Sequence, residues 1–375
     1  MERQDTEKIM LVTSHLECGG QERVMCLLAN YWVNNGREVF LMTLARRTNA
    51  VAFPIDKRVK LVSAQDLPSR FPGKVGKIVS FRTHIGKIDP IAIIVFGDIT
   101  SFVTLIALIG TDYQVIVSER TNMSARKQPF YRYLLRYILY PRAAFLVTQN
   151  KEIDELFTRI VSRNKRRVIP NPILGYDDRT TLENTIVLPG KALISMGRLV
   201  ESKRYDRMID IYYDLHLVRP EWRLFIIGEG PERKKIEAQV KRLGLEGSVV
   251  LLGYEANPTA LLKQADIFLF TSQYEGFPNS LCEAMAVGLS VISYDCPSGP
   301  SDIIINGKNG MLIPNGNGEV FLTSLIDLID SPDKRKVFGQ EAQKITTLFS
   351  MQNVARQWEM LFHSKPISSG KMVNN

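Results

Sequence analysis

The stretch from Tyr274 to Glu283 is the strongest candidate in the sequence for a ligand-binding or catalytic site. It reads Tyr-Glu-Gly-Phe-Pro-Asn-Ser-Leu-Cys-Glu and follows Ile267–Thr271, an apolar run with the length of a buried strand. A helix that begins at Ser280 would offer unpaired N–H groups to a phosphate. Glu275 would then lie near the group attached to that phosphate, and Glu283, in the first helical turn, would accept from vicinal hydroxyls such as those of a ribose. The alternative is structural, because Ser280 and Glu283 also have the spacing of a capping box.

A second group places two cations in one loop. Gly197-Arg198 follows the expected strand Lys191–Met196, and Lys203 comes five positions after Arg198. Arginine suits bidentate phosphate contacts and lysine acts as a compact point charge, so this loop is a candidate diphosphate clamp. The alternative is that both are ordinary solvated loop charges beside Arg204 and Arg207.

Two further groups follow strands in the first half. Gly19 and Gly20 come after the expected strand Ile9–Thr13, where adjacent glycines let the backbone approach a ligand closely. They match neither GxGxxG nor a P-loop, and a simple turn is the alternative. Ser118–Asn122 leaves the expected strand Val115–Val117 with a carboxylate, a guanidinium and an amide together.

The segment Arg126–Arg142 interleaves basic and aromatic residues at helical spacing. This pattern is typical of a helix that lies in a membrane interface, and a nucleic-acid-binding helix has the same pattern. The third possibility is a core-facing helix with a basic outer face. The cations that we assign to a membrane surface are Arg126, Lys127, Arg132 and Arg136.

Charge is distributed unevenly along the chain. The whole sequence has 48 Lys and Arg against 39 Asp and Glu; residues 1–170 have 26 against 15, or +11, and residues 171–375 have 22 against 24, or −2. A basic first half indicates an anionic partner: nucleic acid, an acidic membrane face or a phosphorylated substrate. The hydrophobic content of 45% and charged content of 23% exclude a disordered, fibrous or disulfide-rich class.

Several catalytic and metal-binding patterns are absent from the sequence. It has no DxD, HExxH, GxSxG or CxxC, and only four histidines and four cysteines, so we expect neither a metal nor a cofactor. The N-terminus is charged and lacks a signal-peptide apolar region, which favours a reducing, intracellular location. Pro90–Gly110 carries one charge, Asp98, and we expect a strand, a turn and a helix there rather than a membrane span.

Alternating strands and helices must position these groups. The alternation runs through the first half, restarts at residue 191, and predicts an α/β fold of two doubly wound domains. Ligands of such sheets bind at the carboxyl ends of strands, so the two domains would face each other across a cleft. The predicted segments are a domain over 1–170, a linker over 171–190, a domain over 191–350 and a final helix within 351–365, at Met351–Phe362.

With these motifs the sequence resembles the retaining, GT-B-fold glycosyltransferases of family 4 over nearly its whole length. It looks most like bacterial members that extend surface glycans on undecaprenyl diphosphate. The motifs that carry the resemblance are Gly197-Arg198-Leu199 with Lys203, Gly228-Glu229-Gly230-Pro231, Glu275 with Glu283, Asp295–Ile304, and Gly307-Lys308-Asn309-Gly310.

The resemblance implies a role for each candidate residue. Arg198 and Lys203 would hold the donor diphosphate, Glu275 would face the donor sugar as a catalytic residue, and Glu283 would bind the ribose. Many relatives have a histidine after the strand Val115–Val117, where this chain has Glu119-Arg120, so Arg120 is an acceptor-side candidate. The other donor-binding candidates are Gly276, Phe277, Pro278, Asn279 and Ser280 along the backbone, Tyr254 near the nucleobase, and Gly19 and Gly20, which would shape the cleft.

The implied function is transfer of a hexose or N-acetylhexosamine from a nucleotide diphosphate sugar, with UDP as the expected nucleotide. The acceptor would be a lipid-linked glycan, and the reaction would be retaining and free of metals and other cofactors. The enzyme would bind peripherally to the inner face of the cytoplasmic membrane, without a nucleic-acid partner. Two other classes stay open from the residues: an NADP-dependent oxidoreductase, using Gly19-Gly20 and Arg46-Arg47, and a non-catalytic nucleic-acid-binding protein.

Overall fold

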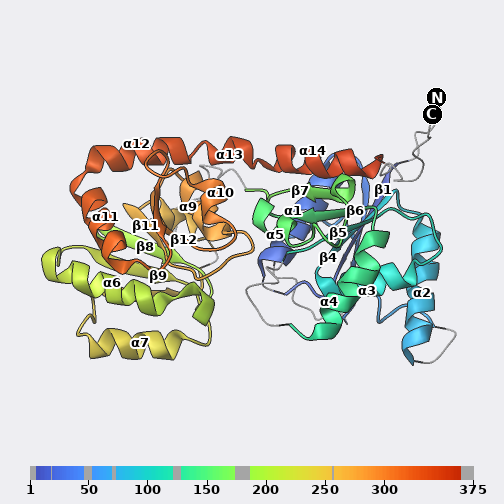
Figure 1. Cartoon of the computed structure of the whole chain (residues 1–375), viewed down its shortest axis with the longest axis horizontal. Coiled ribbons are helices and arrows are strands. Elements are labelled where there is room, and N and C mark those ends of the chain that lie inside the picture. Colours follow the sequence, from blue (N-terminus) through green and yellow to red (C-terminus); the bar gives the residue numbers. More distant parts are fainter. Residues whose placement is uncertain are drawn as a thin grey trace. The chain divides into compact units, whose positions relative to one another are not determined.

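The computed structural model describes residues 6–17, 19–45, 53–69, 73–120, 128–173, 186–255 and 257–364. The chain forms two compact units (Figure 1). The first unit contains residues 1–172 and 351–375, and the second contains residues 173–350. Within the described ranges, no helix combines the length and the apolar character needed to cross a bilayer. Residues 174–185 of the predicted linker lie outside the described residues.

The first unit is built on a parallel sheet of seven strands in the order β3-β2-β1-β4-β5-β6-β7. The strands are β1 (Lys8–Thr13), β2 (Glu38–Thr43), β3 (Lys60–Ser63), β4 (Ala92–Phe96), β5 (Val115–Ser118), β6 (Phe145–Thr148) and β7 (Arg166–Val168). Every residue of β4 is buried, as expected for a central strand covered on both faces. The strand order reverses between β1 and β4, and ligands of open α/β sheets bind at such a point.

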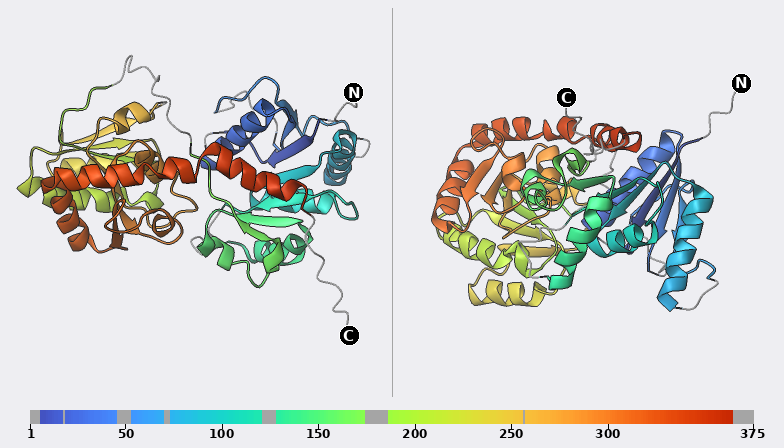
Figure 2. Two further views of the ribbon diagram at one scale, coloured as in Figure 1. Left: turned by 90° about the horizontal axis from the view of Figure 1, so that it is seen from above. Right: turned by 45° about the vertical axis from the view of Figure 1, so that its right-hand side comes forward.

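Helices cover both faces of this first sheet (Figure 2). On one face lie α1 (Gly20–Asn34) and α14 (Met351–Phe362), and on the other lie α2 (Gly73–Ile88), α3 (Asp98–Ala107), α4 (Phe130–Leu139) and α5 (Lys151–Glu155). Trp358 of α14 stacks on Phe96 with ring centroids 6.1 Å apart, and Phe362 meets Trp32 of α1 edge-on at 5.3 Å. The last helix of the chain is therefore part of the core of the first unit.

The second unit has a parallel sheet of six strands in the order β10-β9-β8-β11-β12-β13. The strands are β8 (Ala192–Met196), β9 (Arg223–Ile227), β10 (Val249–Gly253), β11 (Ile267–Phe270), β12 (Ser290–Asp295) and β13 (Met311–Pro314). The α-helices are α6 (Tyr205–Val218), α7 (Arg233–Arg242), α8 (Thr259–Leu262), α9 (Asn279–Ala286), α10 (Pro300–Ile303), α11 (Gly318–Asp330), α12 (Pro332–Ala342) and α13 (Ile345–Leu348). Here the order reverses between β8 and β11, so the loops after these two strands meet at the switch point.

Glycines allow the loops after β8 and β9 to pack backbone against backbone. A Cβ on Gly228 would lie 1.9 Å from the carbonyl oxygen of Gly197, and one on Gly230 would lie 2.3 Å from that of Leu199. Gly228 also has a φ of +141°, a conformation that L side chains rarely adopt. Leu199 N–H donates to the carbonyl of Glu229 at 2.9 Å, which fixes the position of the loop that carries Arg198.

We expect Gly228→Ala to destabilise the protein strongly. The backbone strain alone costs about 1–3 kcal/mol, and the overlap with Gly197 adds to it. Gly190→Ala is the matched control, because a Cβ there meets nothing within 4 Å and its φ lies outside the left-handed region. Urea denaturation should show a reduced free energy of unfolding for Gly228→Ala only; equal values for the two variants would contradict the close packing.

Candidate active site

The loops after β8 and β11 are joined to each other at the carboxyl edge of the second sheet. The hydroxyl of Thr271 donates to the carbonyl of Lys203 at 3.2 Å, and the Gln273 N–H donates to the carbonyl of Ser202 at 2.8 Å. The loop after β12 joins them, because the Glu275 N–H donates to the carbonyl of Pro297 at 3.1 Å. Three loops that are far apart in the sequence thus form one surface around Lys203 and Glu275.

Lys203 and Glu275 form an ion pair at the centre of this surface. Lys203 Nζ donates to Glu275 Oε1 at 2.6 Å, and the two side chains are 20% and 11% exposed. The ammonium also lies 5.2 Å from the ring centroid of Phe270, within range of a cation–π contact. Partial burial strengthens this pair relative to a surface pair and holds both groups in one geometry. The structure therefore brings together two residues that lie 72 positions apart and that the sequence predicts to act on one donor.

Arg198 lies in the same loop as Lys203, but its side chain is exposed. Among the described residues, no hydrogen bond or ion pair is found for its guanidinium. Leu199 beside it is fully buried in the core of the second unit, which anchors the backbone from which Arg198 projects. An anchored backbone with an unpaired guanidinium suits the recognition of an anionic ligand.

We expect Arg198→Ala to weaken binding of a nucleoside diphosphate without loss of stability. Removal of a charge-assisted contact costs about 1.5–3 kcal/mol, or roughly a 10- to 150-fold rise in Kd. Isothermal titration with UDP measures the Kd, and the melting temperature checks the fold. Arg219→Ala serves as the control, because that arginine is paired with Asp330 in the same unit. An unchanged Kd would remove Arg198 from the site.

Helix α9 begins one residue earlier than the sequence predicts, and the capping box that was the structural alternative for Ser280 and Glu283 does not form. The helix starts at Asn279 with Pro278 at the N-cap, and no side chain caps it. Ser280 therefore lies inside the helix, where no partner for its hydroxyl is found among the described residues. Glu283 is the fifth helical residue and is 8% exposed, so it is not in the first turn.

The remaining donor-side candidates lie along the loop between β11 and α9, except Tyr254, which follows β10. The side chain of Phe277 is buried in the core and meets Phe349 edge-on at 5.9 Å, so only its backbone can face a ligand. Pro278 packs closely on Gly299: a Cβ added to Gly299 would lie 2.6 Å from Pro278 Cδ. Gly276 and Asn279 lie on either side of these two residues. Tyr254 directly follows β10 and is 66% exposed, which leaves its ring accessible to a planar ligand.

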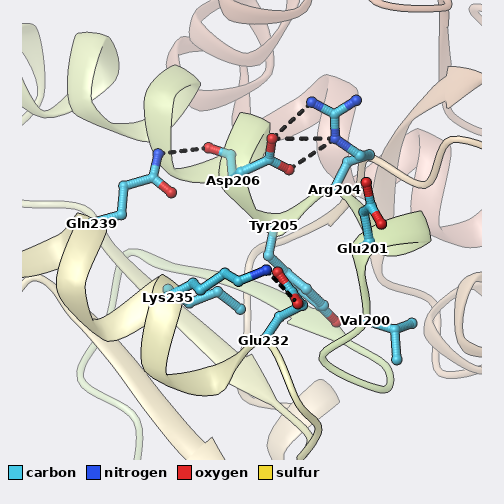
Figure 3. Close-up of a pocket in the computed structure, with 9 residues that line it drawn as sticks. Val200, Glu201, Arg204, Tyr205, Asp206, Glu232, Lys235 and Gln239 are labelled. Atoms are coloured by element: carbon cyan, nitrogen blue, oxygen red, sulfur yellow. Dashed lines mark hydrogen bonds and ion pairs between the residues drawn. The ribbon is translucent and has the colours of Figure 1, made fainter.

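A separate hollow of about 420 Å³ lies beside this surface, between the start of α6 and helix α7 (Figure 3). Its charged groups are Glu201, Arg204, Asp206, Glu232 and Lys235. The hollow contains two ion pairs, Arg204 with Asp206 at 2.7 Å and Lys235 with Glu232 at 2.9 Å. Three carboxylates against two cations make it a poor site for a diphosphate, in contrast to the loop that carries Arg198 and Lys203.

In the first unit, the predicted glycines lie at the switch point between β1 and β4. Gly19 is the N-cap of α1, and a Cβ there would lie 2.1 Å from Glu22 Oε2, so the glycine makes room for that carboxylate. Glu22 is 6% exposed, and His15 Nδ1 lies 3.8 Å from its Oε1. Burial raises the pKa of the Glu22 carboxyl. Cys18 lies outside the described residues.

Arg120 lies at the carboxyl end of β5, at the same edge of the first sheet. It is 8% exposed, its Nε donates to Ser118 Oγ at 2.9 Å, and its Nη1 donates to Asn171 Oδ1. Its guanidinium carbon lies 4.0 Å from the ring centroid of Phe96. Burial lowers the pKa of Arg120 to about 9, which leaves the group charged at neutral pH. No carboxylate within 4 Å of it is found among the described residues.

The assignment of Arg136 to a membrane surface is wrong. Its side chain is fully buried, and its guanidinium donates to Glu119 Oε2 at 3.1 Å and to Asp98 Oδ2 at 3.0 Å. Arg132, one turn earlier, is 28% exposed and pairs with Asp98 at 3.2 Å. Burial raises the pKa of the Glu119 carboxyl, and the charge of Arg136 opposes that shift. Arg126 and Lys127 lie outside the described residues.

Among the described residues, no group of three or more His, Cys, Asp or Glu side chains could hold a metal ion. The three cysteines described there are free and buried. Burial raises the pKa of the Cys26 and Cys296 thiols to about 12, so neither is a thiolate nucleophile.

Residues 181–345 match the family described as glycosyl transferases group 1. The second unit belongs to the group 1 glycosyltransferases. The match includes both loops of the Lys203–Glu275 ion pair and all of α9, so this pair lies within the part of the chain that defines the glycosyltransferase family.

Individual proteins resemble this glycosyltransferase over nearly its whole length. An uncharacterised glycosyltransferase of Haemophilus influenzae is 23% identical over 91% of this chain and 95% of its own. A Campylobacter jejuni enzyme, named as an alpha-1,4-N-acetyl-D-galactosaminyltransferase that acts on a PP-undecaprenol-linked glycan, is 24% identical over 94% and 97%. The crystal structure of Anabaena HepE with UDP and glucose matches with a TM-score of 0.81 and 18% identity over 94% and 98%. The predicted GT-B fold is confirmed by this likeness and by the two parallel sheets.

Sequence reasoning about this glycosyltransferase missed three residues that surround the candidate groups. Glu22 lies against Gly19, and Asp98 forms an ion pair with Arg136. Asn171 accepts a hydrogen bond from Arg120. The spacing Gly19-x-x-Glu22 is the one local pattern that indicated such a contact, since an N3 glutamate can reach back over the N-cap. The partners of Arg120 and Arg136 are 51 and 38 residues away and leave no local pattern.

Proposed function

We propose that this glycosyltransferase moves a hexose or N-acetylhexosamine from a UDP-sugar to a lipid-linked glycan of bacterial surface polysaccharide, with retention of configuration. The observation that carries the proposal is the Lys203–Glu275 ion pair beside exposed Arg198, at the switch point of the second sheet. Two cations in one anchored loop suit a diphosphate, and a carboxylate within 2.6 Å of one of them suits the attached sugar. The UDP complex of HepE and the undecaprenol-linked acceptor of the Campylobacter jejuni relative support the choice of donor and acceptor.

The proposed chemistry needs positioning and charge stabilisation rather than a strong base. The bond from the anomeric carbon to the diphosphate oxygen breaks, and the acceptor oxygen bonds to the same face of that carbon. The leaving diphosphate takes the acceptor proton, while Arg198 and Lys203 stabilise its growing negative charge. Glu275 would orient Lys203 and face the sugar, and buried Glu283 would bind the ribose. No residue in this scheme requires a metal ion.

On the acceptor side, we assign Arg120 as a fixed cation at the carboxyl edge of the first sheet. The charge of Glu22 acts on this guanidinium without an ion-pair contact, and a buried guanidinium is costly unless an anion in contact completes its surroundings. Its fixed geometry, between the Phe96 ring, Ser118 and Asn171, would hold one oxygen of a lipid diphosphate. Gly19 and Gly20, at the start of α1 and at the same edge of the first sheet, would shape the space beside it.

A screen over UDP- and GDP-sugars tests the function. We expect transfer, or slow hydrolysis, with at least one UDP-sugar, a product of unchanged anomeric configuration by NMR, and full activity in EDTA. Release of the sugar with inversion would overturn the retaining mechanism, and loss of activity in EDTA would overturn metal independence. Stabilisation by NADP but not by UDP in a thermal-shift assay would favour the oxidoreductase instead, whose candidate Arg46-Arg47 lies outside the described residues.

We also propose that the first unit binds an anionic membrane, through apolar side chains rather than through Arg136. Eleven of the 22 exposed large apolar or aromatic side chains among the described residues lie on α2, α3 and α4 or directly after α3. They form what we call the apolar face: Val75, Val79, Ile99, Ile106, Ile109, Phe130, Tyr131, Tyr133, Leu134, Tyr137 and Ile138. Such a concentration of exposed apolar side chains marks a binding surface. The excess of basic residues in this half of the chain favours an anionic one, and attachment would place the enzyme at the inner face of the cytoplasmic membrane.

We expect the double variant Phe130→Ser and Tyr137→Ser to lose membrane binding. These rings are 80% and 63% exposed, and loss of one buried aromatic side chain weakens partitioning by about ten-fold or more. The control replaces Val320 and Val337 by serine, two exposed apolar residues of the second unit. In flotation assays, wild type and control should float with vesicles that contain anionic lipid and be partly released by salt. Equal flotation of all three proteins would contradict the assignment of the apolar face.

A further inference from the structure

A small apolar hollow opens in the first unit between α2 and α3. Its volume is about 240 Å³, and it is lined by Leu44, Ala64, Gln65, Lys77, Ile78, Phe81 and Val103. Its two polar side chains bond to each other, since the Lys77 ammonium donates to the Gln65 amide oxygen, and the Gln65 amide nitrogen donates to the carbonyl of Leu44 at 2.7 Å. The rest of the lining is hydrocarbon. Such a hollow suits an apolar ligand, because the Gln65 amide is bonded within the protein and the Lys77 ammonium is exposed at the rim, where it keeps its contact with solvent.

The hollow lies at the edge of the sheet where ligands are expected. Leu44 directly follows β2, and Ala64 and Gln65 directly follow β3. Since all strands of the sheet are parallel, these residues lie at the same carboxyl edge as the Gly19-Gly20 turn after β1. Strand β1 is the neighbour of β2, and adjacent strands are about 4.8 Å apart. A molecule in the hollow is thus within a few strand widths of the residues at the switch point.

The hollow is also continuous with the apolar face. Val103 lies on α3 between Ile99 and Ile106, at positions i, i+4 and i+7, so all three share one side of the helix. Ile99 and Ile106 are 52% and 40% exposed and belong to the apolar face. On α2, Ile78 of the lining comes three positions after Val75, which belongs to the apolar face, so these two residues also share one side of the helix. A hydrocarbon chain that leaves a membrane at this face can enter the hollow along apolar side chains.

Charge at the rim indicates which hydrocarbon would occupy the hollow. Lys77 is exposed and bonds to a neutral amide, and no carboxylate is found within 4 Å of its ammonium among the described residues. The rim therefore presents an uncompensated positive charge next to an apolar lining. A prenyl chain joined to a diphosphate has the complementary arrangement, with anionic oxygens at the end of a branched hydrocarbon.

We propose that this hollow binds the diphosphate-proximal part of the polyprenyl chain of the lipid acceptor. The proposal rests on the proposed function, because it assigns a site to the lipid of that acceptor. It gives the first unit a second point of recognition besides Arg120. The acceptor is then selected by its isoprenoid chain as well as by its sugar.

Binding of farnesyl diphosphate, in detergent-free buffer with saturating UDP to occupy the donor site, tests the proposal. We expect farnesyl diphosphate to bind at least ten-fold more tightly than inorganic diphosphate and than dodecyl phosphate, by isothermal titration. Val103→Trp fills the hollow and should abolish this preference. Val337→Trp makes the same substitution at an exposed helix position of the second unit and should retain the preference. Ala64→Leu, a smaller filling change, should repeat the result if Val103→Trp is unstable.

The outcomes separate this inference from the function on which it rests. Binding of UDP without a preference for farnesyl diphosphate overturns the site and leaves the proposed function standing. Equal binding of dodecyl phosphate overturns the isoprenoid assignment. Equal loss in both tryptophan variants shows that the added bulk acts without entering the hollow, and overturns the hollow as the binding site. Absence of UDP binding contradicts the proposed function itself, whatever farnesyl diphosphate does.

Discussion

Glu275→Gln is expected to lower the rate of sugar transfer by on the order of 100- to 1000-fold while the fold survives. The carboxylate accepts from Lys203 at 2.6 Å and, in the proposed reaction, faces the donor sugar. Loss of one group that stabilises charge in a transition state has an effect of this size. Initial rates with the active UDP-sugar measure the loss. Circular dichroism and the melting temperature establish that the variant is folded.

A charge exchange distinguishes a catalytic Glu275 from a merely structural ion pair. The double variant Lys203→Glu with Glu275→Lys restores an ion pair between the same two positions. If the pair serves only to join the loops after β8 and β11, the exchange should recover activity. If each side chain contacts a different part of the donor, the exchange should recover the melting temperature and remain inactive, which is our expectation. Wild-type rates in Glu275→Gln would remove its catalytic role.

The second large effect is on stability: Arg136→Ala should lower the free energy of unfolding by about 3–5 kcal/mol. Arg136 is fully buried between Glu119 and Asp98, and Tyr140 donates a further hydrogen bond to Glu119 at 2.8 Å. Removal of the cation leaves Glu119 buried without its counter-charge. Urea denaturation provides the measurement.

Arg132→Ala is the matched control on the same helix, because it shortens a partly exposed arginine that also pairs with Asp98. Exposed pairs contribute about 0–1 kcal/mol, so this variant should be close to wild type. The double variant Arg136→Met with Glu119→Leu should recover much of the stability, since a buried ion pair can often be replaced by apolar side chains of similar size. A loss below 1 kcal/mol in Arg136→Ala would show that the buried network is not stabilising.

Regular apolar patterns allowed much of the fold to be predicted from the sequence. The helix Met351–Phe362 is observed with the predicted bounds, and the strands expected at Ile9–Thr13 and Lys191–Met196 are observed with a shift of one residue at their starts. Each combines a clear period with a buried side, and that combination depends only on local spacing. Strand β3 was missed, since it is a short edge strand whose first residue, Lys60, is exposed.

The candidate site was less predictable, because its chemistry depends on which loops meet. The segment of α4 shows the difficulty: its pattern suggested cations outside, whereas Arg136 is buried and Phe130 and Tyr137 are exposed. An arginine inside a helix-covered core becomes favourable only when carboxylates from elsewhere in the chain surround it. At α9, a shift of one residue in the start of the helix moved Ser280 away from the N-cap and excluded the alternative of a capping box with Glu283.

The place of α14 in the core of the first unit has a consequence for the order in which the protein folds as it is synthesised. Trp358 is part of that core. The 178 residues from Ile173 to Ser350, which form the second unit, are translated after the rest of the first unit and before α14. At about 5–20 residues per second, the ribosome needs roughly 10–35 s to cover that distance. The second unit can therefore close its core first, while Trp32 and Phe96 of the earlier unit await their partners. The part of the enzyme that is made first is the last to mature, and for that interval it is the natural client of a chaperone.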